Sequence, residues 1–193
     1  MIKEHVTIMK EVMVDLETMG NGPNAAIVQI GACYFSLSNG TIGKTFLVNV
    51  NLESVMANGA LVDASTILWW LGQSKEAQNS ILGIEEFQNV ETKDEDAALK
   101  EFNEFVAPAK HIWSHATFDF VILMNAMRRL NIRTTFNYKS ERDIRTLVGL
   151  LPKGVDLTQI ERTGLRHNAL ADAVNQAVYC SFAYNVITGW MRT

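Results

Sequence analysis

Three runs rich in β-branched and aromatic residues open this 193-residue chain and restrict its fold more than any other feature. The runs cover residues 11–17, 25–37 and 41–51, and the last two are separated by Ser-Asn-Gly at 38–40. Such a tripeptide between two apolar runs is a hairpin signal, and alternating apolar residues are typical of strands. The sequence therefore predicts an opening of three antiparallel strands.

Helical patterns dominate the remainder of the chain, with a short apolar strand among them. The predicted helices begin at Asp63 and cover residues 92–106, 119–132, 142–151 and 168–190, and the strand covers 111–115. For the second helix, Thr92 and Glu95 have the spacing of a capping box. With three prolines and no repeat or linker, we expect a single domain over residues 1–193. The order of elements predicts an α/β fold in which helices flank a mixed sheet.

Composition excludes several classes of protein. Hydrophobic residues make up 48% and charged residues 20%, and a net charge of −4 argues against a strongly basic coat for DNA. Cys33 and Cys180 are far apart in apolar contexts, which predicts buried free thiols without a disulfide framework. No apolar run reaches the roughly 18–20 residues of a membrane span. The N-terminus also lacks the apolar segment of a signal peptide, so we expect a cytoplasmic protein.

Two acids end the first predicted strand on one face. The apolar run Val12-Met13-Val14 is followed by Asp15 and then Glu17, and residues two apart in a strand project to the same side. The pair would lie roughly 6–7 Å apart, where the carboxylates repel each other and burial costs free energy. Water at a solvated strand end, a basic partner or a metal ion could each compensate.

Three further polar residues interrupt apolar sequence. Asp119 lies where a predicted strand passes into a helix, and Asp172 lies in an alanine-rich helical stretch, five residues after His167. Individually they read as a helix cap, a solvent-facing acid and a loop histidine. Together with Asp15 and Glu17, they form a set of hard oxygen ligands with one base. That set suits two ions of Mg²⁺ or Mn²⁺, and suits zinc less well.

Three motifs resemble those of the DnaQ-like DEDDh 3'-5' exonucleases. The first, "DLET", begins at Asp15, the second is "HATFD" from His115 to Asp119, and the third is "HNALAD" from His167 to Asp172. Their order and spacing agree with the family over roughly residues 11–183. The chain is similar to a prokaryotic and phage branch that includes the mycobacterial-type 3'-5' exoribonuclease domain. One position departs from the pattern, because His115 stands where the family commonly has asparagine.

The resemblance implies a ribonuclease H-like fold and a two-metal hydrolysis. By this analogy Asp15 would contact both ions, Glu17 and Asp172 would complete one site, and Asp119 would serve the other. His167 would act as the general base that takes a proton from the attacking water.

The resemblance also implies a substrate, which is the 3' end of RNA or DNA. Thr18 would hydrogen-bond the terminal nucleotide, and Met19 would contact a base. Trp69 and Trp70 read as packing residues rather than as a platform for stacked bases. Many relatives form homodimers, so the resemblance allows one here.

The sequence leaves two alternatives to this exonuclease. One is a nuclease confined to oligonucleotides of a few residues. The other is a catalytically idle module that binds nucleic acid, which the complete set of four acids and a histidine argues against.

Overall fold

The computed structural model describes residues 9–82 and 90–190 of the chain. Residues 1–8, which bear on the predicted lack of a signal peptide, lie outside the described residues.

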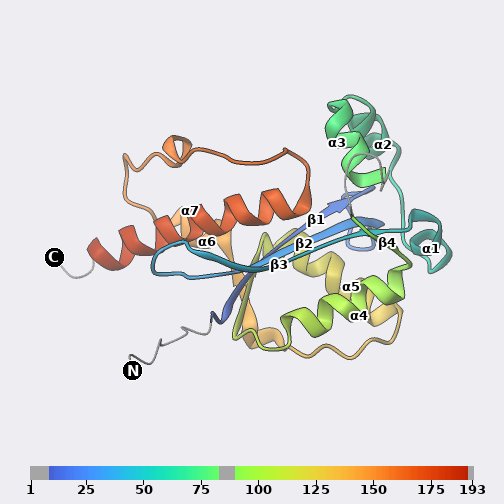
Figure 1. Ribbon diagram of the computed structural model, residues 1–193, viewed down its shortest axis with the longest axis horizontal. Coiled ribbons are helices and arrows are strands. Elements are labelled where there is room, and N and C mark those ends of the chain that lie inside the picture. Colours follow the sequence, from blue (N-terminus) through green and yellow to red (C-terminus); the bar gives the residue numbers. More distant parts are fainter. Residues whose placement is uncertain (1–8, 83–89, 191–193) are drawn as a thin grey trace, which may run out of the picture.

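A six-stranded mixed sheet forms the centre of the molecule, with strand order β4-β3-β2-β1-β5-β6 (Figure 1). The strands are β1 (Glu11–Thr18), β2 (Ile27–Phe35), β3 (Ile42–Val50), β4 (Thr92–Lys93), β5 (His111–Ser114) and β6 (Glu141–Asp143). β1, β2 and β3 pair antiparallel, which confirms the predicted opening. The pairs β1–β5, β5–β6 and β3–β4 are parallel.

Helices cover both faces of this sheet. The α-helices are α1 (Leu52–Ala57), α2 (Ala64–Leu71), α3 (Lys75–Leu82), α4 (Glu95–Val106), α5 (Val121–Arg129), α6 (Ile144–Gly149) and α7 (Ala169–Trp190). A π-helical turn, η1 (Ala116–Phe120), precedes α5, and two 3₁₀ turns are η2 (Tyr138–Ser140) and η3 (Leu157–Gln159). Figure 1 shows α7 on one face, α4 and α5 on the other, and α2 and α3 together at one end of the sheet.

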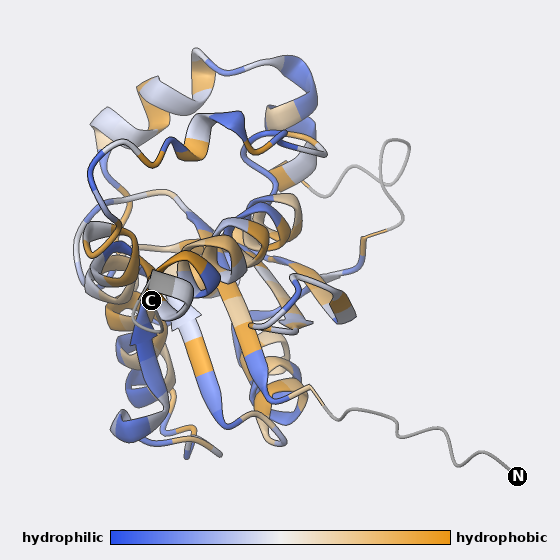
Figure 2. Cartoon of the chain, turned by 90° about the vertical axis from the view of Figure 1, so that its left-hand side faces the viewer, coloured by the Kyte–Doolittle hydropathy of each residue, from blue (hydrophilic) through white to orange (hydrophobic). Residues whose placement is uncertain are grey.

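Strand alternation assigns the residues of β1 to these two layers. Val12, Val14 and Leu16 belong to the core cluster shared with α4 and α5. Met13 belongs to the opposite cluster, which includes Ala177 of α7. Side chains two residues apart share a face, so Asp15 and Glu17 project toward α7. Hydrophobic residues are prominent on the central strands in Figure 2.

The predicted capping box at the start of α4 is wrong. Thr92 belongs to β4 and pairs with Asn49 of β3, and the residue that precedes the helix is Asp94. The side chain of Glu95 turns inward, where it accepts a hydrogen bond from Asn58 and pairs with Arg129. Pairing with β3 and burial of Glu95 therefore prevail over the local capping pattern.

Several element boundaries also differ from the sequence prediction. The predicted helix 142–151 begins instead with β6 and becomes helical at Ile144, where Asp143 caps it through a bond from Thr146 N (2.9 Å). The predicted helix 119–132 divides into η1 and α5, so Asp119 lies inside a π-helical turn and is not a cap. Asp63 does precede α2, but its carboxylate accepts from Asn21 N instead of capping the helix.

The cysteine prediction is confirmed, since Cys33 and Cys180 are buried and free. Among the helices of the described part of the chain, none is long and apolar enough to cross a membrane.

Candidate active site

The carboxyl ends of β1 and β5 meet at one edge of the sheet. The two strands are parallel and Met13 lies opposite Trp113, so the same register brings His115 alongside Asp15. In sheets with parallel strands, this edge is where ligands are commonly bound. The first and second motifs are therefore brought together by strand pairing.

A glycine on β2 brings the third motif to the same edge. Gly31 lies directly opposite Asp15 in the sheet. A Cβ atom at Gly31 would lie 2.1 Å from the carbonyl carbon of Ala169, at the start of α7. Only glycine permits so close an approach, and the first turn of α7 can therefore carry Asp172 to the end of β1.

A buried polar network holds the start of α7 in place. Ala169 N donates to Oε1 of Gln29 on β2 (2.7 Å). The amide nitrogen of Gln29 in turn donates to Oδ1 of Asn49 (2.6 Å) and to the carbonyl of Ser80 (3.0 Å). Gln29 is fully buried, and it joins β3, α3 and α7 at one point.

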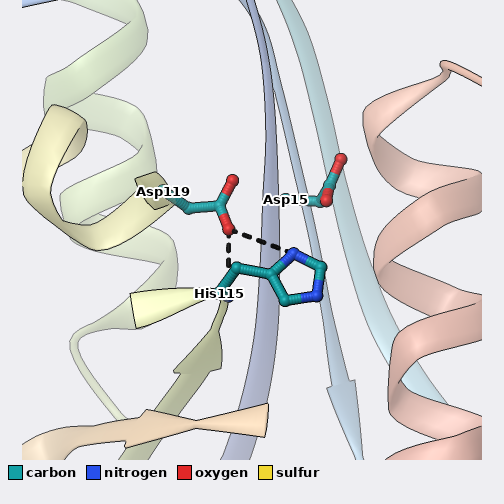
Figure 3. Close-up of side chains that lie close together, drawn as sticks. All are labelled: Asp15, His115 and Asp119. Carbon is teal, nitrogen blue, oxygen red and sulfur yellow. Dashed lines mark hydrogen bonds and ion pairs between the residues drawn. The ribbon is translucent and has the colours of Figure 1, made fainter. Parts of the chain in front are cut away.

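The predicted carboxylates and histidines fall into two groups at this edge. Potential ligand atoms of Asp15, His115 and Asp119 all lie within 4.8 Å of one another (Figure 3). Glu17, His167 and Asp172 satisfy the same limit as a second group. The four acids and His167 predicted from the sequence are therefore all brought together, and His115 joins them.

Backbone and side-chain donors orient the first group. Oδ1 of Asp119 accepts from Leu16 N (3.2 Å), and Oδ2 accepts from His115 N (3.0 Å). Gln176 of α7 donates from Nε2 to Oδ1 of Asp15 (2.6 Å). These bonds fix the carboxylates of β1 and η1 relative to each other and to α7.

The second group contains an ion pair and a left-handed residue. Arg162, in the segment before α7, donates to Oδ1 of Asp172, and His167 N donates to Oδ2 of the same carboxylate (3.1 Å). His167 has φ +60°, a left-handed conformation that is uncommon outside glycine, although asparagine, aspartate and histidine adopt it more often than other residues. Its ring meets the rings of Trp69 and Trp70 edge-on, with centroids 4.9 and 6.0 Å away.

Comparison with known proteins decides the family. Residues 10–184 match the sequence profile of the 3'-5' exoribonuclease Rv2179c-like domain. The chain belongs to this exoribonuclease-domain family. An exodeoxyribonuclease of Enterobacteria phage T4 is 29% identical over an alignment of 179 residues, which covers 78% of this chain and 75% of the phage protein. As a member of this family, the chain is a 3'-5' exonuclease domain, and it is therefore a hydrolase.

Solved structures share the fold of this exonuclease domain. E. coli exonuclease I in complex with a dT13 oligonucleotide is 16% identical, with a TM-score of 0.66 over 94% of this chain. A zinc-bound form of the E. coli exonuclease I–ssDNA complex gives 14% identity and a TM-score of 0.56 over 94% of this chain. The exonuclease domain spans 42% and 41% of those two chains. The predicted ribonuclease H-like fold is confirmed.

Burial raises the pKa values of Asp15, Glu17 and Asp119, and the charges of neighbouring acids add to this effect at Asp15 and Glu17. Burial, followed by the charges of Asp119, Glu17 and Asp172, raises the pKa of Asp15 well above its usual range. Burial, with Asp172 and Asp119, also raises the pKa of Glu17 to about 8. Burial raises the pKa of Asp119 to about 7, although backbone N–H donors oppose the rise.

The donor set of the exonuclease site fits a divalent cation. Arg162 lowers the pKa of Glu17, but burial and the neighbouring acids outweigh it. Arg145 lowers the pKa of Asp119, but burial outweighs it. In the described part of the chain, Oε1 of Gln176 is also buried beside Asp15 without a hydrogen-bond partner. Carboxylate oxygens are the ligands of hard ions such as Mg²⁺ and Mn²⁺, whose charge would relieve this repulsion.

A pocket of about 450 Å³ opens beside the second group. Its lining consists of Leu16, Glu17, Thr18, Asn21, Ser65, Thr66, Trp69 and Phe118. The backbone of Thr18 is held by Trp70, whose Nε1 donates to the Thr18 carbonyl (3.0 Å). Trp69 is 46% exposed, whereas Trp70 is buried. Met19 instead lines an apolar hollow with Trp70 and Ile81, so its contact with a base stays a prediction.

Sequence reasoning missed four residues that shape this exonuclease site. Gln176 could have been found, because it follows Asp172 by one helical turn and shares its face. Gly31, Gln29 and Arg162 gave no signal, since each acts through a contact that arises only when the chain folds.

Proposed function

We propose that this chain is a metal-dependent 3'-5' exonuclease of the DEDDh type. It removes nucleotides from the 3' end of single-stranded or 3'-overhang nucleic acid and releases nucleoside 5'-monophosphates. The observation that carries the proposal is the convergence of four carboxylates, from β1, η1 and α7, at one largely buried edge. Buried like charges destabilise a fold unless something neutralises them, and a structural role gives no reason to gather them.

The four acids would hold two divalent ions, either Mg²⁺ or Mn²⁺. When bound, two such ions stabilise the attacking and leaving oxygens of a phosphodiester during hydrolysis. Asp15 is central to this arrangement, because its pKa is raised by the charges of all three other acids. The zinc-bound form of the E. coli exonuclease I–ssDNA complex supports metal binding by a protein of this fold.

His167 is the general base in this proposal. Its ring nitrogen lies within 4.8 Å of carboxylate oxygens of Glu17 and Asp172, which puts it beside the metal ligands. Contacts with Trp69 and Trp70 restrict the orientation of the ring. From this position the imidazole accepts a proton from the water that attacks the phosphorus atom.

The terminal nucleotide occupies the 450 Å³ pocket in this proposal. That volume falls within the roughly 300–1,000 Å³ of typical small-ligand sites. Thr18 lies at its wall, although its hydroxyl already donates to the carbonyl of Gly20 (2.8 Å), and the partly exposed ring of Trp69 provides an aromatic surface. Stacking on an aromatic ring tolerates any base, which suits an enzyme that shortens strands of varied sequence.

The matching family is an exoribonuclease domain, whereas the phage relative is an exodeoxyribonuclease, so the test of the proposal compares RNA with DNA as substrates. RNA and DNA oligonucleotides labelled at the 5' end would be compared as single strands, blunt duplexes and 3'-overhang duplexes, with Mg²⁺, Mn²⁺ or EDTA. A ladder that shortens from the 3' end only with metal supports the proposal. Failure to shorten any substrate with either metal would favour the idle binding module.

The expected cytoplasmic location and homodimer stay predictions.

Two variants separate metal binding from proton transfer. Asp15→Ala should abolish both turnover and bound metal. His167→Asn should lower the rate by about 10²–10⁴-fold while metal binding persists, since asparagine tolerates a left-handed backbone but supplies no base. Full activity in Asp15→Ala would refute the mechanism.

A further inference from the structure

His115 directs its ring toward the space between Asp15 and Asp119 (Figure 3). It directly follows β5, and its side chain is 24% exposed. The distance from its Nδ1 to Oδ2 of Asp119 is 3.8 Å, which is too long for a hydrogen bond. The ring therefore faces two carboxylates without bonding directly to Asp119.

Ordinary structural roles do not account for this ring. The backbone N–H of His115 already donates to Asp119, and a residue of any type except proline would supply that bond. The residue precedes η1, yet its side chain makes no capping hydrogen bond. The imidazole is therefore an additional potential ligand beside the carboxylates of Asp15 and Asp119.

We propose that His115 supplies a nitrogen ligand to the divalent ion held between Asp15 and Asp119. The inference rests on the proposed function, because it concerns an ion of that same site. Ligand atoms bound at about 2.0–2.2 Å to an octahedral ion lie about 3 Å apart when adjacent and about 4 Å apart when opposite. A separation of 3.8 Å, with all three ligand atoms within 4.8 Å, needs only small side-chain movements to reach that geometry.

A nitrogen ligand from His115 should change which divalent ion the site prefers. Mg²⁺ takes oxygen ligands almost exclusively, whereas imidazole nitrogen is a good ligand for later divalent ions. A site of two carboxylates and one imidazole should therefore favour Mn²⁺ or Co²⁺ over Mg²⁺ more than an all-oxygen site does. His115→Asn replaces the nitrogen with an amide oxygen and should reduce that preference.

Pulsed electron paramagnetic resonance of bound Mn²⁺ tests this directly, because a coordinated imidazole couples its ¹⁴N nucleus to the metal electrons. The parent protein should show this coupling, and His115→Asn should lose it. Mn²⁺ affinity in that variant should fall by about tenfold or more, with Mg²⁺ affinity changing less. His111→Asn is the matched control, since His111 lies at the other end of β5 and contacts Glu11.

His167 is the other imidazole near the carboxylates, so His167→Asn tests whether it is the source of the ¹⁴N coupling. This variant should retain the coupling. Loss of the coupling in His167→Asn, or its persistence in His115→Asn, would overturn the assignment to His115. Mn²⁺ binding without any ¹⁴N coupling in the parent would overturn the inference and leave the proposed exonuclease intact. Absence of Mn²⁺ binding in the parent would overturn the inference, and absence of Mg²⁺ binding as well would overturn the proposed function.

Discussion

The amide of Gln176 donates to the carboxylate of Asp15 across 2.6 Å and so joins α7 to the end of β1. Among the influences on Asp15, this hydrogen bond favours the ionised form, whereas burial and the neighbouring acids oppose it. Gln176 therefore favours the ionised form of Asp15, which is the form that the proposed cation needs. Its own Oε1 is buried without a partner among the described residues.

Gln176→Leu should weaken the site without removing a metal ligand. Loss of the donor leaves Asp15 harder to ionise, and metal affinity or activity should fall by about 10–100-fold, as is usual for residues that orient ligands. The measurement is kcat/KM as a function of Mn²⁺ concentration. Asn185→Leu, which removes an amide near the other end of α7, is the control and should retain the parent's Mn²⁺ dependence. An equal loss in both variants would contradict the role of Gln176.

Asp15→Asn should inactivate the enzyme and stabilise its metal-free form. Asparagine keeps an oxygen that can accept from Gln176, but it removes the charge that three other acids oppose. In EDTA at pH 8 the variant should melt above the parent, by roughly 2–4 °C for each kcal/mol gained. Added Mn²⁺ should raise the Tm of the parent and have much less effect on the variant. A lower Tm for the variant in EDTA would refute this account of the repulsion.

The stability of the metal-free protein should fall as pH rises from about 4 to 8. Folding raises the pKa of Glu17 from 4.5 to about 8 and that of Asp119 from 3.8 to about 7. In this range the folded state binds more protons than the unfolded state, so the free energy of unfolding decreases with pH. Urea denaturation in EDTA across this range measures the slope. Saturating Mn²⁺ should reverse the decline at high pH, and an unchanged slope would count against a metal role.

The sequence predicted the elements whose own side chains define them. β1, β2 and β3 are rich in β-branched and aromatic residues, and α7 carries a helical pattern over most of its length. By contrast, β4 and β6 contain two and three residues. Their strand character comes from pairing with β3 and β5, and short segments of this kind have no periodicity to detect.

The residues of the site likewise divide into those that the sequence predicted and those that it did not. The four acids and His167 were predicted because polar residues at the ends of apolar elements are costly and therefore conspicuous. The structure brings them together, and their catalytic roles stay predictions. Gly31 and Arg162 were not found, because their importance arises from packing and ion pairing across the fold. Candidate ligands and bases are therefore more visible in this sequence than the residues that bring them together.

Gly31→Ala should disrupt the site by displacing the start of α7. The added Cβ would meet backbone atoms of Ala169 and Leu170 at 2.1 and 2.2 Å, which a side-chain rotation cannot relieve. The start of α7 must then move, and the free energy of unfolding should fall by about 3 kcal/mol or more. Gly149→Ala is the control, because a Cβ there meets nothing within 4 Å and should leave the Tm unchanged or slightly raised.

Metal affinity separates this local effect from general destabilisation. Leu99→Ala removes a fully buried side chain of α4, in the layer on the other face of the sheet, and should also cost about 2–5 kcal/mol. Because α7 carries Asp172 and Gln176, Gly31→Ala should weaken Mn²⁺ binding by the folded protein, as measured by titration calorimetry well below the Tm. Leu99→Ala should bind Mn²⁺ as the parent does. Equal affinities in the two variants would show that the contact between β2 and α7 does not position the metal ligands.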